Sequence, residues 1–135
     1  STVVYVDESD DKALDTALFR ASRAYEGFLA PPVGDQSFEE RVAIHAERFN
    51  ARGEDGAAKI MANLFDPEYL LENQLVFIGS VETVTEQLHD AAAKGLFNTF
   101  MGEFNFSDLP EDDLMRSIRL FGEKVMPALQ GFEPF

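Results

Sequence analysis

The sequence predicts an α/β fold, because strand-like and helix-like segments alternate three times along its 135 residues. The apolar run at residues 75–79, Leu-Val-Phe-Ile-Gly, lacks polar alternation, as expected for a parallel strand covered on both faces. After each strand-like segment, apolar residues recur at spacings of three and four, the period of a helix. We therefore expect a parallel sheet whose strands are joined by right-handed helical crossovers.

The first unit, residues 1–73, begins with a strand. Residues 2–6, Thr-Val-Val-Tyr-Val, are mostly β-branched or aromatic, which favours a strand. Apolar residues between Ala13 and Phe28 recur at helical spacing and predict a helix of about five turns. The proline pair that follows disfavours a helix and predicts a loop from Ala30 to Gln36.

A helical insertion completes this first unit. Ser37, followed three residues later by Glu40, matches a capping box, and Gly53 is typical of the residue just after a helix. These signals predict a helix over residues 37–52. The apolar spacing in residues 54–73 predicts a short helix that is broken at an Asp-Pro pair.

The second and third units are shorter. In residues 74–95, Ser80 is a good N-cap for the helix after the strand, and a glycine ends that helix. In residues 96–130, the run 96–101, Leu-Phe-Asn-Thr-Phe-Met, predicts the third strand, and a proline at the first helical position opens the last helix. Residues 131–135 form a tail.

Composition narrows the classes of partner. With 25 acidic and 11 basic residues the formal charge is −14, which repels nucleic acid backbones and anionic lipid surfaces. We therefore expect neither nucleic acid nor a membrane as a partner, and we interpret the acidity as a solvated surface. The chain has no cysteine and no apolar run of membrane-spanning length, which is typical of a cytoplasmic protein.

Two architectures fit three strand-helix units: an open doubly wound sheet and part of an eight-stranded α/β barrel. Both place function at the carboxyl ends of the strands. A dinucleotide-binding open sheet needs a glycine fingerprint after its first strand, and residues 7–12, Asp-Glu-Ser-Asp-Asp-Lys, contain no glycine. This absence disfavours the nucleotide-binding open sheet.

Residues 76–130 closely resemble the C-terminal end of the bacterial-luciferase-like flavin-dependent monooxygenases. That family ends with a hydrophobic strand and Gly-Ser or Gly-Thr, a helix, a glycine-containing connection, a last strand and a closing helix with an "RS…LF…VMPAL" pattern. The matching residues are Gly79, Ser80, Glu82, Val84, Gly95, Pro110, Arg116, Ser117, Leu120, Phe121, Val125, Met126, Pro127, Ala128 and Leu129. Val81 departs from the family, which often has proline there.

The resemblance implies that residues 1–135 are the last three βα units of a (β/α)8 TIM barrel. It further implies a flavin-dependent oxidoreductase, a monooxygenase that uses reduced flavin and O₂ on a small organic substrate. The expected cofactor is flavin mononucleotide (FMN), or deazaflavin in some branches, and most of its phosphate contacts lie on earlier strands. An α/β binding or dimerisation module without flavin remains the alternative.

A complete barrel needs eight strands and roughly 250 residues, so this chain supplies only part of one. Three barrel strands leave two open edges and an uncovered interior face. We therefore expect the earlier barrel strands of a parent chain, or a second copy in a homo-oligomer, as the partner of this surface.

The resemblance places six residues near the ligands. Gly79 and Ser80 would border the cofactor, although Ser80 also suits a purely structural N-cap. The substrate mouth would be formed by Met101, Gly102, Glu103 and Asn105. Glu103 suits an ordinary solvated loop position equally well.

Other polar residues carry weaker expectations. Asn98 and Thr99 would face the barrel interior and find structural hydrogen bonds there, whereas His45 and His89 share no motif and are expected on helix surfaces. The acidic run after the first strand lacks the glycine and the bidentate glutamate of a calcium loop, so we expect no metal site. No residue is assigned as catalytic.

Overall fold

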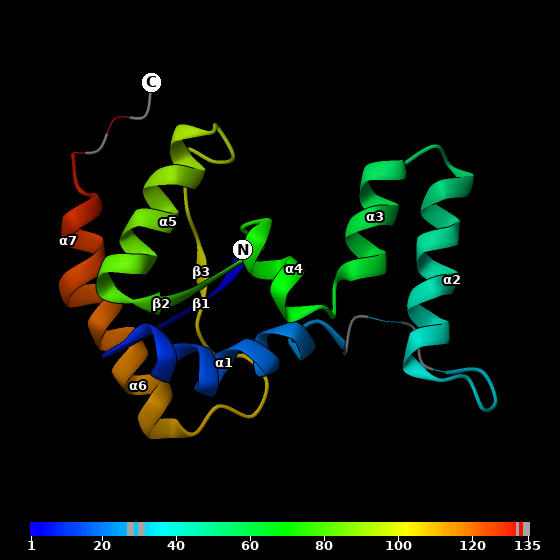
Figure 1. Ribbon diagram of the computed structural model, residues 1–135, viewed down its shortest axis with the longest axis horizontal. Coiled ribbons are helices and arrows are strands. Elements are labelled where there is room, and N and C mark those ends of the chain that lie inside the picture. The colour runs from blue at the N-terminus through cyan, green and yellow to red at the C-terminus, as the bar shows by residue number, and fades with distance from the viewer. Residues whose placement is uncertain (27–28, 30–31, 132, 134–135) are drawn as a thin grey trace.

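The structure, a computed structural model, is a three-stranded parallel sheet with helices on both faces (Figure 1). It describes residues 1–26, 29, 32–131 and 133. The elements are β1 (Thr2–Asp7), α1 (Asp10–Arg23), α2 (Phe38–Ala51), α3 (Asp55–Asn63), α4 (Pro67–Glu72), β2 (Val76–Ser80), α5 (Val81–Ala93), β3 (Gly102–Glu103), α6 (Glu111–Leu120), the π-helical turn η2 (Phe121–Val125) and α7 (Met126–Leu129). The predicted α/β class and parallel sheet are confirmed.

The first unit follows the prediction except at the two ends of its first helix. α1 begins earlier than expected because Ser9 caps it, accepting a hydrogen bond from the backbone N–H of Lys12. The capping box at Ser37 and Glu40 is present in full, and the helix it opens ends before Gly53, which has a φ of 75°. The first helix ends at Arg23, earlier than the expected end near Phe28, and residues 24–25 form a turn. Phe28 itself, the start of the loop at Ala30 and most of the tail lie outside the described residues.

The third strand was placed wrongly. Residues 96–101 are not a strand, and β3 consists only of Gly102 and Glu103. The apolar residues of the predicted run occur in adjacent pairs, without the alternation of a strand. Two of them instead build an aromatic cluster, in which the rings of Phe97 and Phe100 pack edge-on against Phe77.

The strand order is β2-β1-β3, with every pair parallel. In a barrel each strand pairs with the next along the chain, so β2 would lie between the other two strands. Here the chain moves in opposite directions from β1 to β2 and from β2 to β3. Right-handed crossovers then place α1 and α5 on opposite faces, which is the arrangement of a doubly wound sheet.

Both faces of the sheet are closed by the helices of this chain. On one face Val3, Tyr5 and Ile78 pack with α1, α4 and Phe106. On the other face β1 and β2 pack with α5 and η2. The expected uncovered barrel interior is therefore not found among the described residues, because the opposed crossovers supply a helix layer for each face.

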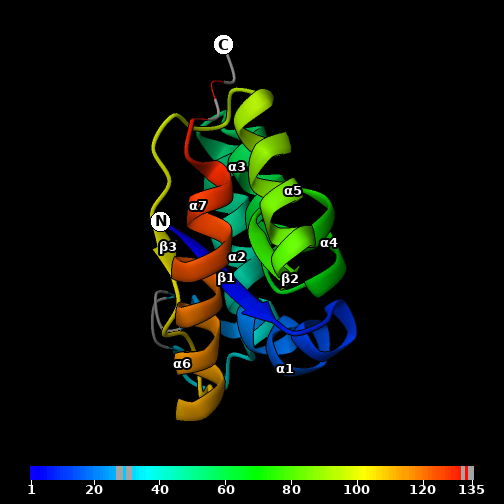
Figure 2. The same ribbon diagram turned by 90° about the vertical axis from the view of Figure 1, so that its left-hand side faces the viewer.

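The helical parts differ in how they join the sheet. α2 and α3 form a pair set to one side of the sheet (Figure 1). α6, η2 and α7 form one continuous column that crosses β1 (Figure 2). Pro127 lies in the first turn of α7, and its missing backbone donor gives a reason for the π-helical turn just before it.

Candidate functional site at the carboxyl end of β1

Asp7 ends the central strand and is fully buried, with none of its side chain exposed. Side chains alternate along a strand, so Asp7 lies on the same face as Val3 and Tyr5. A buried carboxylate needs hydrogen bonds and a positive partner to offset its loss of water. The surroundings of Asp7 provide both.

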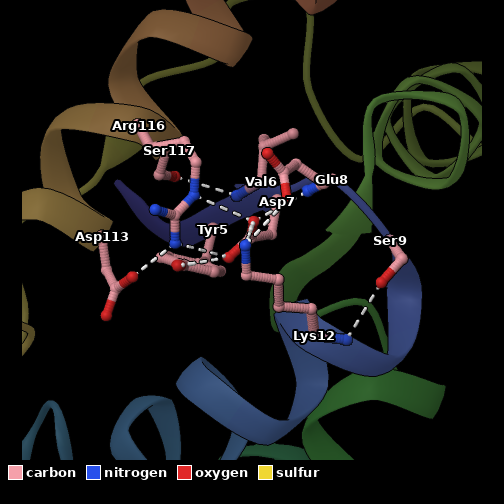
Figure 3. Close-up of polar contacts among 9 residues, drawn as sticks. All are labelled: Tyr5, Val6, Asp7, Glu8, Ser9, Lys12, Asp113, Arg116 and Ser117. Carbon is pink, nitrogen blue, oxygen red and sulfur yellow. Dashed lines mark hydrogen bonds and ion pairs between the residues drawn. The ribbon is translucent and has the colours of Figure 1, made fainter.

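Arg116 on α6 is the main partner of Asp7 (Figure 3). Its Nε and a terminal nitrogen donate hydrogen bonds of 3.0 and 3.1 Å to the two carboxylate oxygens, a bidentate arrangement. The Tyr5 hydroxyl and the backbone N–H of Glu8 donate further bonds of 2.8 Å each. Arg116 also pairs with Asp113, one turn earlier on α6. The Lys12 ammonium lies 3.5 Å from the Asp7 carboxylate as a second cation, so the buried charge is compensated in full.

The network fixes the charge states of its members. Burial alone raises the pKa of Asp7, but the hydrogen bonds from Arg116, Glu8 and Tyr5 outweigh it and lower the pKa to about 2. Burial, followed by the hydrogen bond to Asp7, raises the pKa of Tyr5. Asp7 therefore stays ionised and Tyr5 stays protonated at neutral pH, which suits an electrostatic anchor better than proton transfer.

Ser117, next to Arg116, makes the second attachment of α6. β3 pairs only with Thr2 and Val3, so it does not reach the edge of β1 beside Val6. At this point the Ser117 hydroxyl oxygen accepts a hydrogen bond of 2.9 Å from the N–H of Val6. A side chain of α6 thus takes the place of a neighbouring strand in satisfying a buried donor.

The predicted cofactor residues lie at the adjacent strand end. Ser80 caps α5, and its own N–H donates a hydrogen bond of 2.7 Å to the Asp10 carboxylate. The other oxygen of Asp10 accepts a bond of 2.9 Å from the Thr83 hydroxyl. A Cβ atom at Gly79 would lie 2.7 Å from Thr83 and 2.9 Å from Asp10, so the glycine is required by close packing.

These residues do not fit a flavin phosphate. The Asp10 carboxylate, hydrogen-bonded to the Ser80 amide and the Thr83 hydroxyl, lies beside the helix N-terminus where an anion would bind. A phosphate would meet a negative charge here, and the amide of Ser80 already has an acceptor. In this chain the Gly79–Ser80 segment therefore acts as a helix cap.

The predicted substrate-mouth residues lie elsewhere. Glu103 pairs with Val3, whereas Gly79 pairs with Val6, so the two predicted groups flank different levels of β1, roughly 10 Å apart along it. The structure therefore does not bring them together. Met101 and Asn105 are exposed, and Glu103 hydrogen-bonds Tyr25, whose pKa is raised by burial and by this carboxylate.

One further expectation was wrong, and one buried network was not predicted. Asn98 and Thr99 are exposed and face no interior. The buried network of Asp7, Tyr5 and Arg116 was not predicted, because Asp7 was read as the start of an acidic helix N-terminus. The available signal was its place in the alternation after Val3 and Tyr5 on a strand that is otherwise apolar.

The part of the chain that the structure describes has neither a metal-binding cluster nor a membrane-spanning helix. No group of three or more acidic, histidine or cysteine side chains there could hold a metal ion. Within the same residues, none of the helices has the length and apolar character needed to cross a bilayer.

Comparison of the chain with models of known protein families, with curated proteins and with solved structures gave no match.

Proposed function

We propose that this chain is the C-terminal part of a flavin-dependent monooxygenase of the bacterial-luciferase-like kind. The complete enzyme would use reduced flavin, FMN or deazaflavin, and O₂ to oxidise a small organic substrate in the cytoplasm. When bound, the flavin supplies the oxygen chemistry. The role of this chain is to complete the fold and to stabilise the strands on which the flavin site is built.

One observation carries the proposal. Arg116 and Ser117 open the "RS…LF…VMPAL" pattern, and these two side chains attach α6 to β1. Further along the pattern, Phe121 and Val125 are buried against the second face of the sheet. The residues that resemble the family therefore together attach the last helical column to the sheet. This common structural role supports the view that the pattern has the same origin here as in the family.

The proposal includes a (β/α)8 barrel for the complete enzyme. In that barrel β2 would have to pair with both β1 and β3, whereas this chain has the order β2-β1-β3. The earlier strands would then displace the helices that now cover one face. The flavin phosphate contacts would come from those earlier strands, since the negative charge of Asp10 lies beside the N-terminus of α5.

A second candidate is a non-catalytic binding or dimerisation module. Two observations favour it: both sheet faces are already covered, and the Ser80 amide at the position predicted for the cofactor already donates to a carboxylate of the chain itself. Such a module would fold alone and ignore flavin.

Three measurements on the purified protein distinguish the monooxygenase from the binding module: its intact mass, its association state and its visible flavin absorbance. The monooxygenase proposal expects a longer polypeptide that carries this chain or co-purifies with it, bound flavin, and oxygen uptake when the flavin is reduced. A folded, colourless assembly of this chain alone, unchanged by added FMN or deazaflavin, would overturn the proposal and favour the binding module.

A further inference from the structure

A cavity of about 380 Å³ lies between the end of α1 and the α2–α3 pair. Its walls are largely apolar, with Phe38, Val42, Ala62 and Phe65 among them. Arg23, in the last turn of α1, supplies the positive charge. The cavity has the size and the mixture of apolar walls and few polar groups that small-molecule sites have.

The Arg23 guanidinium is held by aromatic rings. It lies 4.7 Å from the ring centre of Phe38, 5.6 Å from Phe19 and 5.7 Å from Phe65. Phe38 and Phe65 in turn pack edge to face, with centres 4.0 Å apart. Contacts through ring faces fix a guanidinium while leaving its N–H groups available for an oxygen acceptor.

Three other arginines, Arg20, Arg52 and Arg116, have such an acceptor. Arg20 pairs with Asp108 and Arg116 with Asp7, each through hydrogen bonds to a carboxylate. Arg52 is the closest counterpart of Arg23, because it lies 4.8 Å from the ring of Phe49 and still pairs with Glu54. Within the described residues Arg23 has no carboxylate partner, although the chain has 25 acidic residues.

Two acidic residues line the cavity without pairing with Arg23. The Asp66 carboxylate caps α4, accepting bonds of 3.0 and 3.3 Å from the backbone N–H groups of Glu68 and Tyr69. Glu39 is exposed in the first turn of α2. Their negative charges limit the total anionic charge that the cavity accepts, which disfavours phosphates and dicarboxylates.

We propose that this cavity binds a small organic monocarboxylate with a flat apolar body. The carboxylate accepts two hydrogen bonds from Arg23, and the apolar body packs against Phe38, Phe65 and Val42. This site is far from the Asp7 network and does not depend on the flavin proposal, since no residue is shared between them.

The test uses three probes of one shape: phenylpropionate, phenylpropanol and phenylpropylamine. Each is titrated into the ¹⁵N-labelled full chain, and the amide shifts of α1, α2 and α3 are followed by NMR. We expect phenylpropionate to bind about tenfold more tightly than phenylpropanol, as one charge-assisted contact allows. The amine should bind most weakly.

Variants locate the effect. Arg23→Gln should abolish the preference for the carboxylate while leaving weak binding of the alcohol. Arg52→Gln is the matched control, because Arg52 also lies on a phenylalanine ring yet has its own carboxylate, and it should leave the preference unchanged.

Three results would overturn the proposal: equal binding of the acid and the alcohol, tighter binding of the amine, or shifts confined to other parts of the chain. A fourth would be an acid preference that survives in Arg23→Gln. Should Arg23→Gln unfold, the comparison of the three probes on the unchanged protein still tests the proposal. Arg23→Lys keeps the charge but loses the bidentate geometry, so it should weaken the preference for the carboxylate.

Discussion

Arg116 and Asp7 lie 109 positions apart in the sequence, and two hydrogen bonds of 3.0 and 3.1 Å join the guanidinium of one to the carboxylate of the other. The Asp7 side chain is fully buried, whereas 26% of the Arg116 side chain is exposed. The pair is therefore asymmetric: removal of Arg116 leaves a buried carboxylate whose remaining cationic neighbour is the Lys12 ammonium, 3.5 Å away. This contact joins the last helical column to the first strand.

Arg116→Met should destabilise the protein by about 1–3 kcal/mol, since the buried Asp7 carboxylate loses two charge-assisted hydrogen bonds and keeps only the more distant Lys12 as a cation. Urea denaturation followed by far-ultraviolet circular dichroism measures the free energy of unfolding. Arg119→Met is the matched control on the same helix, because Arg119 is exposed and should change that free energy by less than about 0.5 kcal/mol. Equal effects of the two variants would show that the pair adds nothing.

The double variant Asp7→Asn with Arg116→Met tests whether the cost comes from the stranded charge. Once Asp7 is neutral, loss of Arg116 should cost less unfolding free energy than it does in the unchanged protein. The sum of the losses in the two single variants should therefore exceed the loss in the double variant by about 1 kcal/mol or more. Additive effects would mean that the two side chains stabilise the fold independently.

Acid should destabilise the protein through Asp7. Its pKa is about 2 in the folded protein against an ordinary 3.8, so the folded state binds this proton more weakly than the unfolded state. The resulting stability, about 2 kcal/mol, is complete above about pH 4 to 5 and is lost as the pH falls towards 2.

Urea unfolding of the unchanged protein and of Asp7→Asn, repeated at several pH values, checks this prediction. The variant should be less stable at neutral pH and should lose less stability on acidification. It will keep some acid sensitivity, because hydrogen bonds from Ser80 and Thr83 also lower the pKa of Asp10. Parallel curves for the two proteins would contradict a role for Asp7.

Local signals in the sequence predict most of the helices and the two long strands. The start of α2 was predicted from Ser37 and Glu40 because a capping box involves only neighbouring residues. The third strand was misplaced because apolar residues such as Phe97 and Phe100 build a tertiary aromatic cluster, and composition does not separate that role from a strand.

The strand order and the buried network could not be read from local patterns. The order depends on the direction of each crossover, and three strand-helix units are compatible with either direction. The contact between Asp7 and Arg116 depends on where α6 returns to the sheet, which no residue near Asp7 encodes. The alternation Val3, Tyr5, Asp7 was sufficient to predict a buried carboxylate, but not its partner.

The packing around Gly79 predicts opposite effects for two glycine substitutions. Gly79→Ala places a Cβ atom 2.7 Å from Thr83 and 2.9 Å from Asp10, so it should destabilise the protein by about 1–3 kcal/mol. Gly56→Ala, in the first turn of α3, meets nothing within 4 Å and should stabilise by up to about 1 kcal/mol. Thermal melts of both variants provide the comparison, and a neutral Gly79→Ala would show that the helix cap can shift freely.

Ser117 and Ser22 are both buried in helices, and replacing each by alanine distinguishes an essential hydrogen bond from a redundant one. Ser117→Ala leaves the N–H of Val6 without its acceptor, which should cost about 1–3 kcal/mol and speed amide exchange at Val6. Ser22→Ala removes a hydroxyl that only donates to the carbonyl of Phe19 in its own helix, so its effect should be small. Hydrogen exchange by NMR reports Val6 directly, and unchanged exchange there in Ser117→Ala would mean that another group or water replaces the hydroxyl at the edge of β1.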